Sequence, residues 1–367
     1  MRRIFTYIHQ QKDWPRFTWD DQQLLSMLGK VRHLQGKLIG KMEGLGFSLR
    51  EEASLDTLTL DVLKTSEIEG EVLDMKQVRS SIAKHLGMNI PGLIKSDRNV
   101  DGIVQMMLDA TQQSNKPLTV QRLFNWHAAL FPTGRSGMYK IVVGKWRTGP
   151  MQVVSGAMGK EIVHFQAPDE KKVSKEITEF IKWFNKKDTI DPVIKAGIAH
   201  LWFITIHPFD DGNGRIARAI ADMQLAKSDG SLQRFYSMSA QIKIERKKYY
   251  ETLEKTQKGK LDITDWLSWF LNCLMSALAV TDKTLVRVMA KVQFWETHGN
   301  TQLSSRQREI INKLLDGFDG KLTSSKWAKI TKCSADTALR DIQDLIAKDI
   351  LRKELSGGRS TNYLINI

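Results

Sequence analysis

The chain has 367 residues, of which 41% are hydrophobic and 26% charged, and its formal net charge is +14. This composition is typical of a globular protein of two or three domains, and it lacks the run of about 18 uncharged apolar residues that a membrane span needs. The residues after Met1 lack the apolar core of a signal peptide, and the two cysteines, Cys273 and Cys333, lie far apart. We therefore expect a cytoplasmic protein without a disulfide, and polyanionic partners such as nucleotides or nucleic acid.

Residues 1–95 predict an N-terminal helical domain. Apolar residues recur at helical spacing from Asp20 to Leu45, which indicates one long helix with a buried face. A second helix is predicted from about Leu55 to Ile68, and Gly70 follows its end. A third helix is predicted over 75–86.

Residues 96–290 predict a helical core with one β-type interruption. Glycines and prolines cluster over 137–168, with short β-type runs between them, which indicates a small hairpin region. Helices are then predicted over 170–185 and 191–206, and another follows over 216–226. The fold class that we expect is therefore mainly α.

Residues 300–367 predict a separate unit. Three short helical patterns are followed by two β-type runs that flank Gly357 and Gly358, which is the element order of a winged-helix domain. Such a domain binds DNA or another protein. The side chains that could face DNA are Thr337, Arg340 and Gln343 on the third helix, and Arg352, Lys353 and Arg359 near the wing.

The segment His207–Arg218, with the sequence HPFDDGNGRIAR, carries most of the functional information. Gly212 and Gly214 let the backbone approach a ligand, and successive amides at the start of a helix form an anion site. Arg215 and Arg218 share one face of the helix that follows, because residues three apart are neighbours on a helix. Two guanidinium groups beside a helix N-terminus suit a ligand with several phosphates.

The same segment also contains an acid and a base. Asp211 is a carboxylate beside the predicted phosphate site, which suits one Mg²⁺ ion. His207 has the only side chain in the segment with a near-neutral pKa, so it is the natural general base for a hydroxyl that attacks phosphorus. A metal hydrolase that uses His200, His207 and Asp211 is a weaker alternative, because nothing completes the ligand set.

The segment resembles the signature of the Fic family, HxFx(D/E)GNGRxxR, at every fixed position. The resemblance implies a Fic-type helical bundle with a small β-hairpin flap, and transfer of AMP from ATP to a Ser, Thr or Tyr hydroxyl of a target protein. It implies that His207 is the base, that Asp211 holds Mg²⁺, that Arg215 contacts the β-phosphate and Arg218 the γ-phosphate. The ATP-binding residues that it implies are Asp211, Gly212, Asn213, Gly214, Arg215, Ile216, Ala217, Arg218, Tyr249 and Gln257.

Two further segments are similar to parts of Fic proteins. The first would be the flap that docks the target chain by backbone pairing, and its residues are Ile162, Val163, His164 and Phe165. An ordinary hairpin is the alternative for this segment. Tyr249 and Gln257 stand where such proteins contact the adenosine, although a core or surface role fits these two residues as well.

An inhibitory motif precedes the predicted core. Residues Thr65–Gly70 match the family pattern (S/T)xxxE(G/N), with Glu69 as the glutamate, in a helix at about 55–70. A carboxylate paired with Arg218 would take the partner of the γ-phosphate and place negative charge where phosphate must bind. In relatives with this glutamate the reverse reaction, removal of AMP, also occurs. The resemblance thus implies a subgroup with an N-terminal inhibitory helix and a C-terminal winged-helix domain.

One alternative of a different class is left open. A DNA-binding transcriptional regulator, whose central domain only senses a nucleotide, would also explain the tail and the positive charge. The sequence does not name the target protein, and it leaves open whether the chain forms a homodimer.

Overall fold

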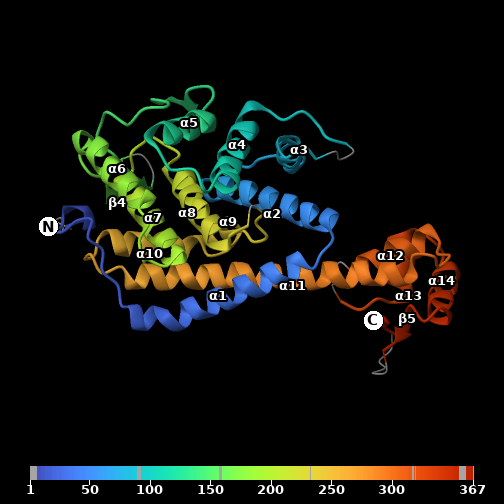
Figure 1. The fold of residues 1–367 in the computed structure, drawn as a ribbon. Helices are drawn as coiled ribbons and strands as arrows, with labels where there is room; N and C mark the ends of the chain where they lie inside the picture. Colours follow the sequence, from blue (N-terminus) through green and yellow to red (C-terminus); the bar gives the residue numbers. More distant parts are fainter. Residues whose placement is uncertain are drawn as a thin grey trace. The chain divides into compact units, whose positions relative to one another are not determined.

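The computed structural model describes residues 6–88, 92–156, 159–231, 233–315, 318, 320–354 and 361–366. The chain divides into two compact units, residues 1–279 and 280–367, and is mainly helical, as predicted (Figure 1). None of the helices in the described part is long and apolar enough to cross a membrane.

The first unit opens with a short 3₁₀ turn, η1 (Ile8–Gln10), and three helices. The helices are α1 (Asp21–Glu43), α2 (Phe47–Ile68) and α3 (Met75–His85). Side chains of Asp20 and Asp74 accept hydrogen bonds from backbone N–H groups in the first turns of α1 and α3, which fixes where these helices begin. Helix α2 begins before the predicted Leu55, because the stretch from Leu49 to Ala53 consists of strong helix formers without an apolar period.

Helices α7 and α8 form the centre of this unit (Figure 1). Every residue of α7 (Pro192–Ile206) after the proline is buried, which explains why its sequence is apolar on all sides. The loop 207–212 joins it to α8 (Asn213–Asp229), and the side chains of Ile216 and Ala217 are fully buried in α8. The other helices of this unit are α4 (Arg98–Gln112), α5 (Val120–Leu130), α6 (Glu170–Asn185), α9 (Met238–Ile244), α10 (Arg246–Gln257) and the first part of α11 (Thr264–His298), which continues past residue 279.

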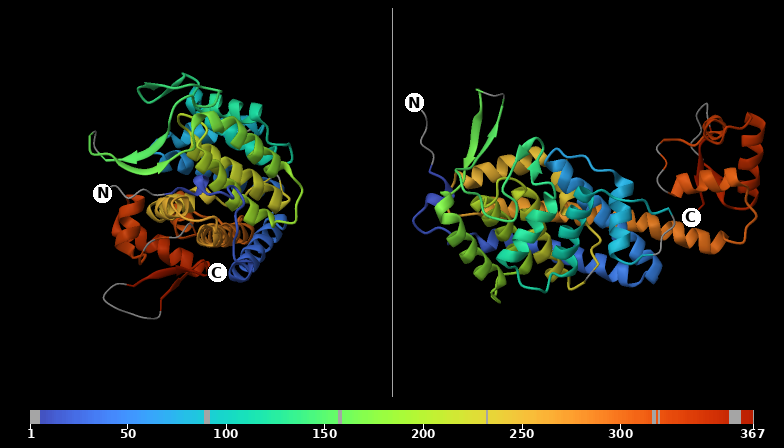
Figure 2. Two further views of the ribbon diagram at one scale, coloured as in Figure 1. Left: turned by 90° about the vertical axis from the view of Figure 1, so that its left-hand side faces the viewer. Right: turned by 90° about the horizontal axis from the view of Figure 1, so that it is seen from above.

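Two antiparallel hairpins interrupt the helices, where the sequence predicted one hairpin region over 137–168, and the first of them begins just before that range. The first pairs β1 (Arg135–Ser136) with β2 (Tyr139–Lys140), and the second pairs β3 (Gln152–Ser155) with β4 (Ile162–Gln166). Both views in Figure 2 place the β3–β4 hairpin beside the N-terminal segment. The contact is made by Tyr7, whose ring lies 5.3 Å from that of Phe165, centroid to centroid.

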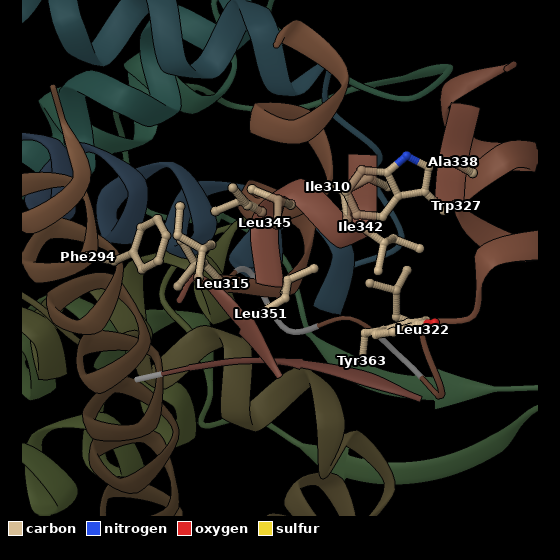
Figure 3. Close-up of a cluster of buried hydrophobic side chains, with 12 residues drawn as sticks. Phe294, Ile310, Leu315, Leu322, Trp327, Ala338, Ile342, Leu345, Leu351 and Tyr363 are labelled. Carbon is tan, nitrogen blue, oxygen red and sulfur yellow. The ribbon is translucent and has the colours of Figure 1, made fainter. Parts of the chain in front are cut away.

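The second unit has the predicted order of three helices and two strands. These elements are α12 (Ser305–Leu315), α13 (Ser324–Thr331), α14 (Ala335–Ala347), β5 (Leu351–Lys353) and β6 (Tyr363–Ile365). Its core gathers around Trp327, Ile342 and Leu345, which Figure 3 shows pointing toward one another. Arg340 and Gln343 are exposed on α14, and Arg359 lies outside the described residues.

Candidate active site

A pocket of about 640 Å³ lies between the β3–β4 hairpin, the loop after α7, and α10. The predicted residues His207, Asp211, Asn213 and Gly214 line it, together with Glu69. Its other lining residues are Met151, Gln152, Val153, Val154, Ser155, His164, Phe165, Ile204, Asp210, Arg246, Lys247, Tyr249, Tyr250, Glu251, Leu253, Glu254 and Gln257. Six of the predicted catalytic and ATP-binding residues thus line one cavity: His207, Asp211, Asn213, Gly214, Tyr249 and Gln257.

The loop between α7 and α8 is held in shape by its own residues. His207 and Gly212 adopt the left-handed conformation, with φ of 51° and 79°. The side chain of Asn213 accepts a hydrogen bond from the N–H of Phe209 at 3.0 Å and donates one to the carbonyl of Phe209 at 2.8 Å. Asn213 thus fixes the turn with its side chain, and the backbone amides at the start of α8 remain for a ligand.

One hydrogen bond fixes the ring of His207 and its protonation. Its Nδ1 lies 3.2 Å from the carbonyl oxygen of Ile204, and because a carbonyl only accepts, Nδ1 carries the proton and Nε2 is free to accept one. Burial lowers the pKa of His207 from 6.5 to about 4, so the ring is neutral near pH 7. Arg147 donates to the carbonyl oxygen of His207 at 2.8 Å and to that of Gly149 at 2.7 Å.

Sequence reasoning missed Arg147, and it also missed His127. The ring of His127 stacks on Phe209 with centroids 4.1 Å apart, and its Nε2 lies 3.2 Å from the carbonyl oxygen of Asp211. The carboxylate of Asp211 accepts a hydrogen bond from the hydroxyl of Ser136 and another, at 2.6 Å, from the N–H of Gly212. No local pattern marks His127 or Arg147, because each acts on a loop distant in the sequence.

Arg218 is 2% exposed and is held by the end of α2. Its Nε donates to the hydroxyl of Thr65 at 2.7 Å, and its Nη2 donates to the Thr65 carbonyl at 2.9 Å and to Oε1 of Glu69 at 2.7 Å. The carboxylate also covers the first turn of α8, because a Cβ placed on Gly214 would lie 2.2 Å from the same Oε1. The two residues of the predicted inhibitory pair are therefore in contact.

Arg215 is covered by a carboxylate as well. Its Nη1 lies 2.5 Å from Oε2 of Glu71, and its guanidinium lies 5.1 Å from the ring centroid of Phe131. Neither Arg215 nor Arg218 lines the main pocket. The sequence singled out both arginines but not Glu71, which looks like an ordinary surface residue.

Comparison with known protein families identifies the domain that contains this loop. Residues 117–225 match the Fic/DOC family. The matched range contains the loop after α7, with His207, and both arginines of α8. Residues 7–88, which include α2, Glu69 and Glu71, match a domain of unknown function, DUF4172.

Individual relatives support the Fic assignment at modest identity. Protein adenylyltransferase fic-1 of Caenorhabditis elegans is 29% identical over 178 residues, which are 47% of this chain and 32% of that protein. Protein adenylyltransferase Fic of Drosophila melanogaster is 32% identical over 108 residues, which are 29% of this chain and 19% of that protein. The chain thus covers about a third or less of the length of these relatives.

Solved structures show the same fold. A Fic family protein from Desulfovibrio desulfuricans has a TM-score of 0.52 and 18% identity, over 94% of this chain and 95% of that chain. Fic-1 from C. elegans has a TM-score of 0.50 and 20% identity, over 73% of each chain. The mainly helical Fic fold predicted from the sequence is confirmed.

The two predicted adenosine contacts, Tyr249 and Gln257, line the pocket and are buried. The hydroxyl of Tyr249 lies 3.0 Å from Nε2 of His200, and the side-chain amide of Gln257 donates to the hydroxyl of Thr205 at 3.2 Å. In the described part of the chain, no three His, Cys, Asp or Glu residues are grouped so that they could hold a metal ion. His200, His207 and Asp211 therefore do not form the hydrolase site weighed as an alternative.

The four predicted flap residues of the Fic domain fall into two pairs. Ile162 and Val163 are 61% and 39% exposed, whereas Phe165 is 2% exposed and packs on Tyr7. The ring of His164 lies between two partners, with Nδ1 2.7 Å from Oε2 of Glu254 and Nε2 2.6 Å from the hydroxyl of Ser155. The exposed pair leaves one part of β4 accessible to another chain, while the buried residue fixes the hairpin to the domain.

Proposed function

We propose that this protein is a protein adenylyltransferase that transfers AMP from ATP to a Ser, Thr or Tyr hydroxyl of a target protein. The observation that carries the proposal is the placement of a neutral His207, with Nε2 free, beside the N-terminal turn of α8 in one pocket. The worm and fly relatives are named protein adenylyltransferases, which agrees with the proposal.

The proposed reaction uses groups of the pocket together with the two arginines that lie behind Glu69 and Glu71. Nε2 of His207 takes the proton of the target hydroxyl, and the oxygen attacks the α-phosphorus of ATP. A new O–P bond forms, the bond to the bridging oxygen breaks, and pyrophosphate leaves with that electron pair. The amides that open α8 and the cationic side chains of Arg215 and Arg218 stabilise the negative charge on the phosphates.

Asp211 is the residue that would hold Mg²⁺. Mg²⁺ in phosphoryl-transfer sites takes one or two carboxylates and completes its shell with water and phosphate oxygens. A single carboxylate beside an anion-binding helix end fits this requirement, and the described residues contain no larger cluster of acidic, histidine or cysteine ligands. When bound, the ion neutralises charge on the phosphates.

Glu69 would inhibit the transfer. Its carboxylate occupies Arg218 and covers Gly214, so the γ-phosphate of ATP must compete with a negative charge already present. The exposed residues Ile162 and Val163 would pair with the backbone of the target and bring its hydroxyl toward His207.

The test is transfer of label from ATP carrying ³²P at the α-phosphate, with Mg²⁺ and a cell lysate as the source of targets. We expect strong labelling of protein by the Glu69→Gly variant, weak labelling by the wild type, and none when His207→Ala is added to Glu69→Gly. ATP labelled at the γ-phosphate should give no labelling, and mass spectrometry should find AMP on a hydroxyl residue.

Two results would contradict the proposal. One is transfer that survives His207→Ala, and the other is labelling from the γ-phosphate, which would indicate phosphorylation. A chase of labelled protein with wild-type and Glu69→Gly chains then tests removal of AMP, which the glutamate would support by orienting a water molecule.

A further inference from the structure

The end of α2 brings two carboxylates, not one, to the arginines of α8. Gly70 has a φ of +89°, and the N–H groups of Glu69 and Glu71 both donate to the carbonyl of Ser66, at 3.0 and 3.1 Å. This compact glycine turn places the side chains of Glu69 and Glu71 against Arg218 and Arg215 respectively. The two carboxylates that flank Gly70 thus each contact one of the two arginines of α8.

The turn is anchored without help from either carboxylate. Lys243 donates to the carbonyl of Glu67 at 2.8 Å, and Arg246 donates to the carbonyl of Ile68 at 2.9 Å. Both bonds engage the backbone at the end of α2. Removing a glutamate side chain should therefore leave the turn in place and release only the arginine that it covers.

Arg215 is built to receive an anion. It is 3% exposed, and among the described atoms its Nε has no hydrogen-bond partner. By contrast, the side chain of Glu71 is 48% exposed and lines a second pocket, of about 510 Å³, together with Arg215. The buried guanidinium of Arg215 is therefore paired with a half-exposed carboxylate, that of Glu71. Another anion can replace this carboxylate, because Glu71 can turn into water without leaving a charge buried.

We propose that Glu71 is a second inhibitory carboxylate, which occupies Arg215 as Glu69 occupies Arg218. The inference rests on the proposed function, in which both arginines bind phosphates of the nucleotide. It follows that Glu69→Gly releases only part of the site. A nucleotide with a β-phosphate must still displace Glu71, whereas AMP meets neither arginine.

The test is the affinity of the full chain for AMP, ADP and ATP, measured by isothermal titration calorimetry in the Glu69→Gly background. Addition of Glu71→Ala should tighten ADP and ATP binding by about two- to fivefold, the range expected for a partly exposed charge pair, and leave AMP binding unchanged. Glu71→Gln, which keeps the size and loses the charge, should act in the same direction. Glu67→Ala is the matched control, because Glu67 lies on the same turn but pairs with Lys64 at 2.7 Å.

The outcomes separate this proposal from the proposed function. Unchanged ADP affinity in both Glu71 variants would overturn the second carboxylate, and so would an equal gain with Glu67→Ala or an equal gain for AMP. A gain in ADP affinity without transfer of AMP in any variant would contradict the adenylyltransferase and retain the role of Glu71. Transfer of AMP by Glu69→Gly, with no effect of the Glu71 variants on nucleotide affinity, would support the adenylyltransferase and contradict the role of Glu71.

Discussion

Replacing Glu69 by alanine should make the protein less stable and, at the same time, more strongly stabilised by ATP. The substitution removes one of the three hydrogen bonds that the described residues make to Arg218, and it leaves that buried guanidinium with only the two oxygens of Thr65. Removing one partner of a fully buried ion pair costs about 3–5 kcal/mol. Because the Glu69 side chain is 30% exposed, we expect a smaller loss in the free energy of unfolding, about 1–3 kcal/mol.

ATP should reverse this loss, because its phosphates supply the anion that the variant lacks. A ligand at 100 times its Kd adds about 2.7 kcal/mol to the folded state. In the wild type the same ligand must first displace Glu69, so its apparent affinity and its stabilising effect are lower.

The measurement is the unfolding midpoint Tm of wild type, Glu69→Ala and the control Glu67→Ala, with and without ATP and Mg²⁺. Each kcal/mol corresponds to roughly 2–4 °C for a domain of this size class. We expect Glu69→Ala to unfold lowest without nucleotide and to show the largest rise with it. Equal rises in all three proteins, or an equal loss of stability in Glu67→Ala, would show that Glu69 does not compete with phosphate.

Two other predictions concern acid stability and the flap. Burial lowers the pKa of His127 to about 4 and that of His200 to about 3, so between these values and 6.5 the unfolded chain binds more protons than the folded one. The free energy of unfolding should therefore fall as the pH drops from 6.5 toward 4, by about 3 kcal/mol for each histidine, and urea titrations that give a constant value across this range would contradict the assignment. Tyr7→Ala should speed hydrogen exchange of the β3–β4 amides, because a two-stranded hairpin is marginal without packing and Tyr7 packs on Phe165; Tyr7→Phe should not, and equal exchange in both variants would refute the contact as the anchor.

The loop 207–218 could be interpreted from its sequence because its chemistry is local. Glycines, an acid, a base and two arginines at fixed spacing between apolar helices predict an anion site without reference to the rest of the chain. Sequence also identified Glu69, through a short motif at the end of a helix. Asn213, which the resemblance to Fic proteins assigns to the ATP site, has its side chain bonded to the backbone of Phe209.

The residues that sequence reasoning missed share a different property. Glu71 meets Arg215 across 144 positions, Arg147 meets the carbonyl of His207 across 60, and His127 meets the carbonyl of Asp211 across 84. Each is a common residue type in a helix or loop, and its role depends on a partner that no periodic pattern connects to it.

The sequence by itself determined the helices, the position of the hairpins and the reactive loop, because helix periodicity, glycine conformation and capping act over a few residues. Only the tertiary structure decided which groups are free to act. It bonded Nδ1 of His207 to a backbone carbonyl, covered both arginines with carboxylates from one turn, and packed the β3–β4 hairpin on Tyr7. These features depend on burial and charge pairing between distant segments, and such pairings exist only once the helices have packed.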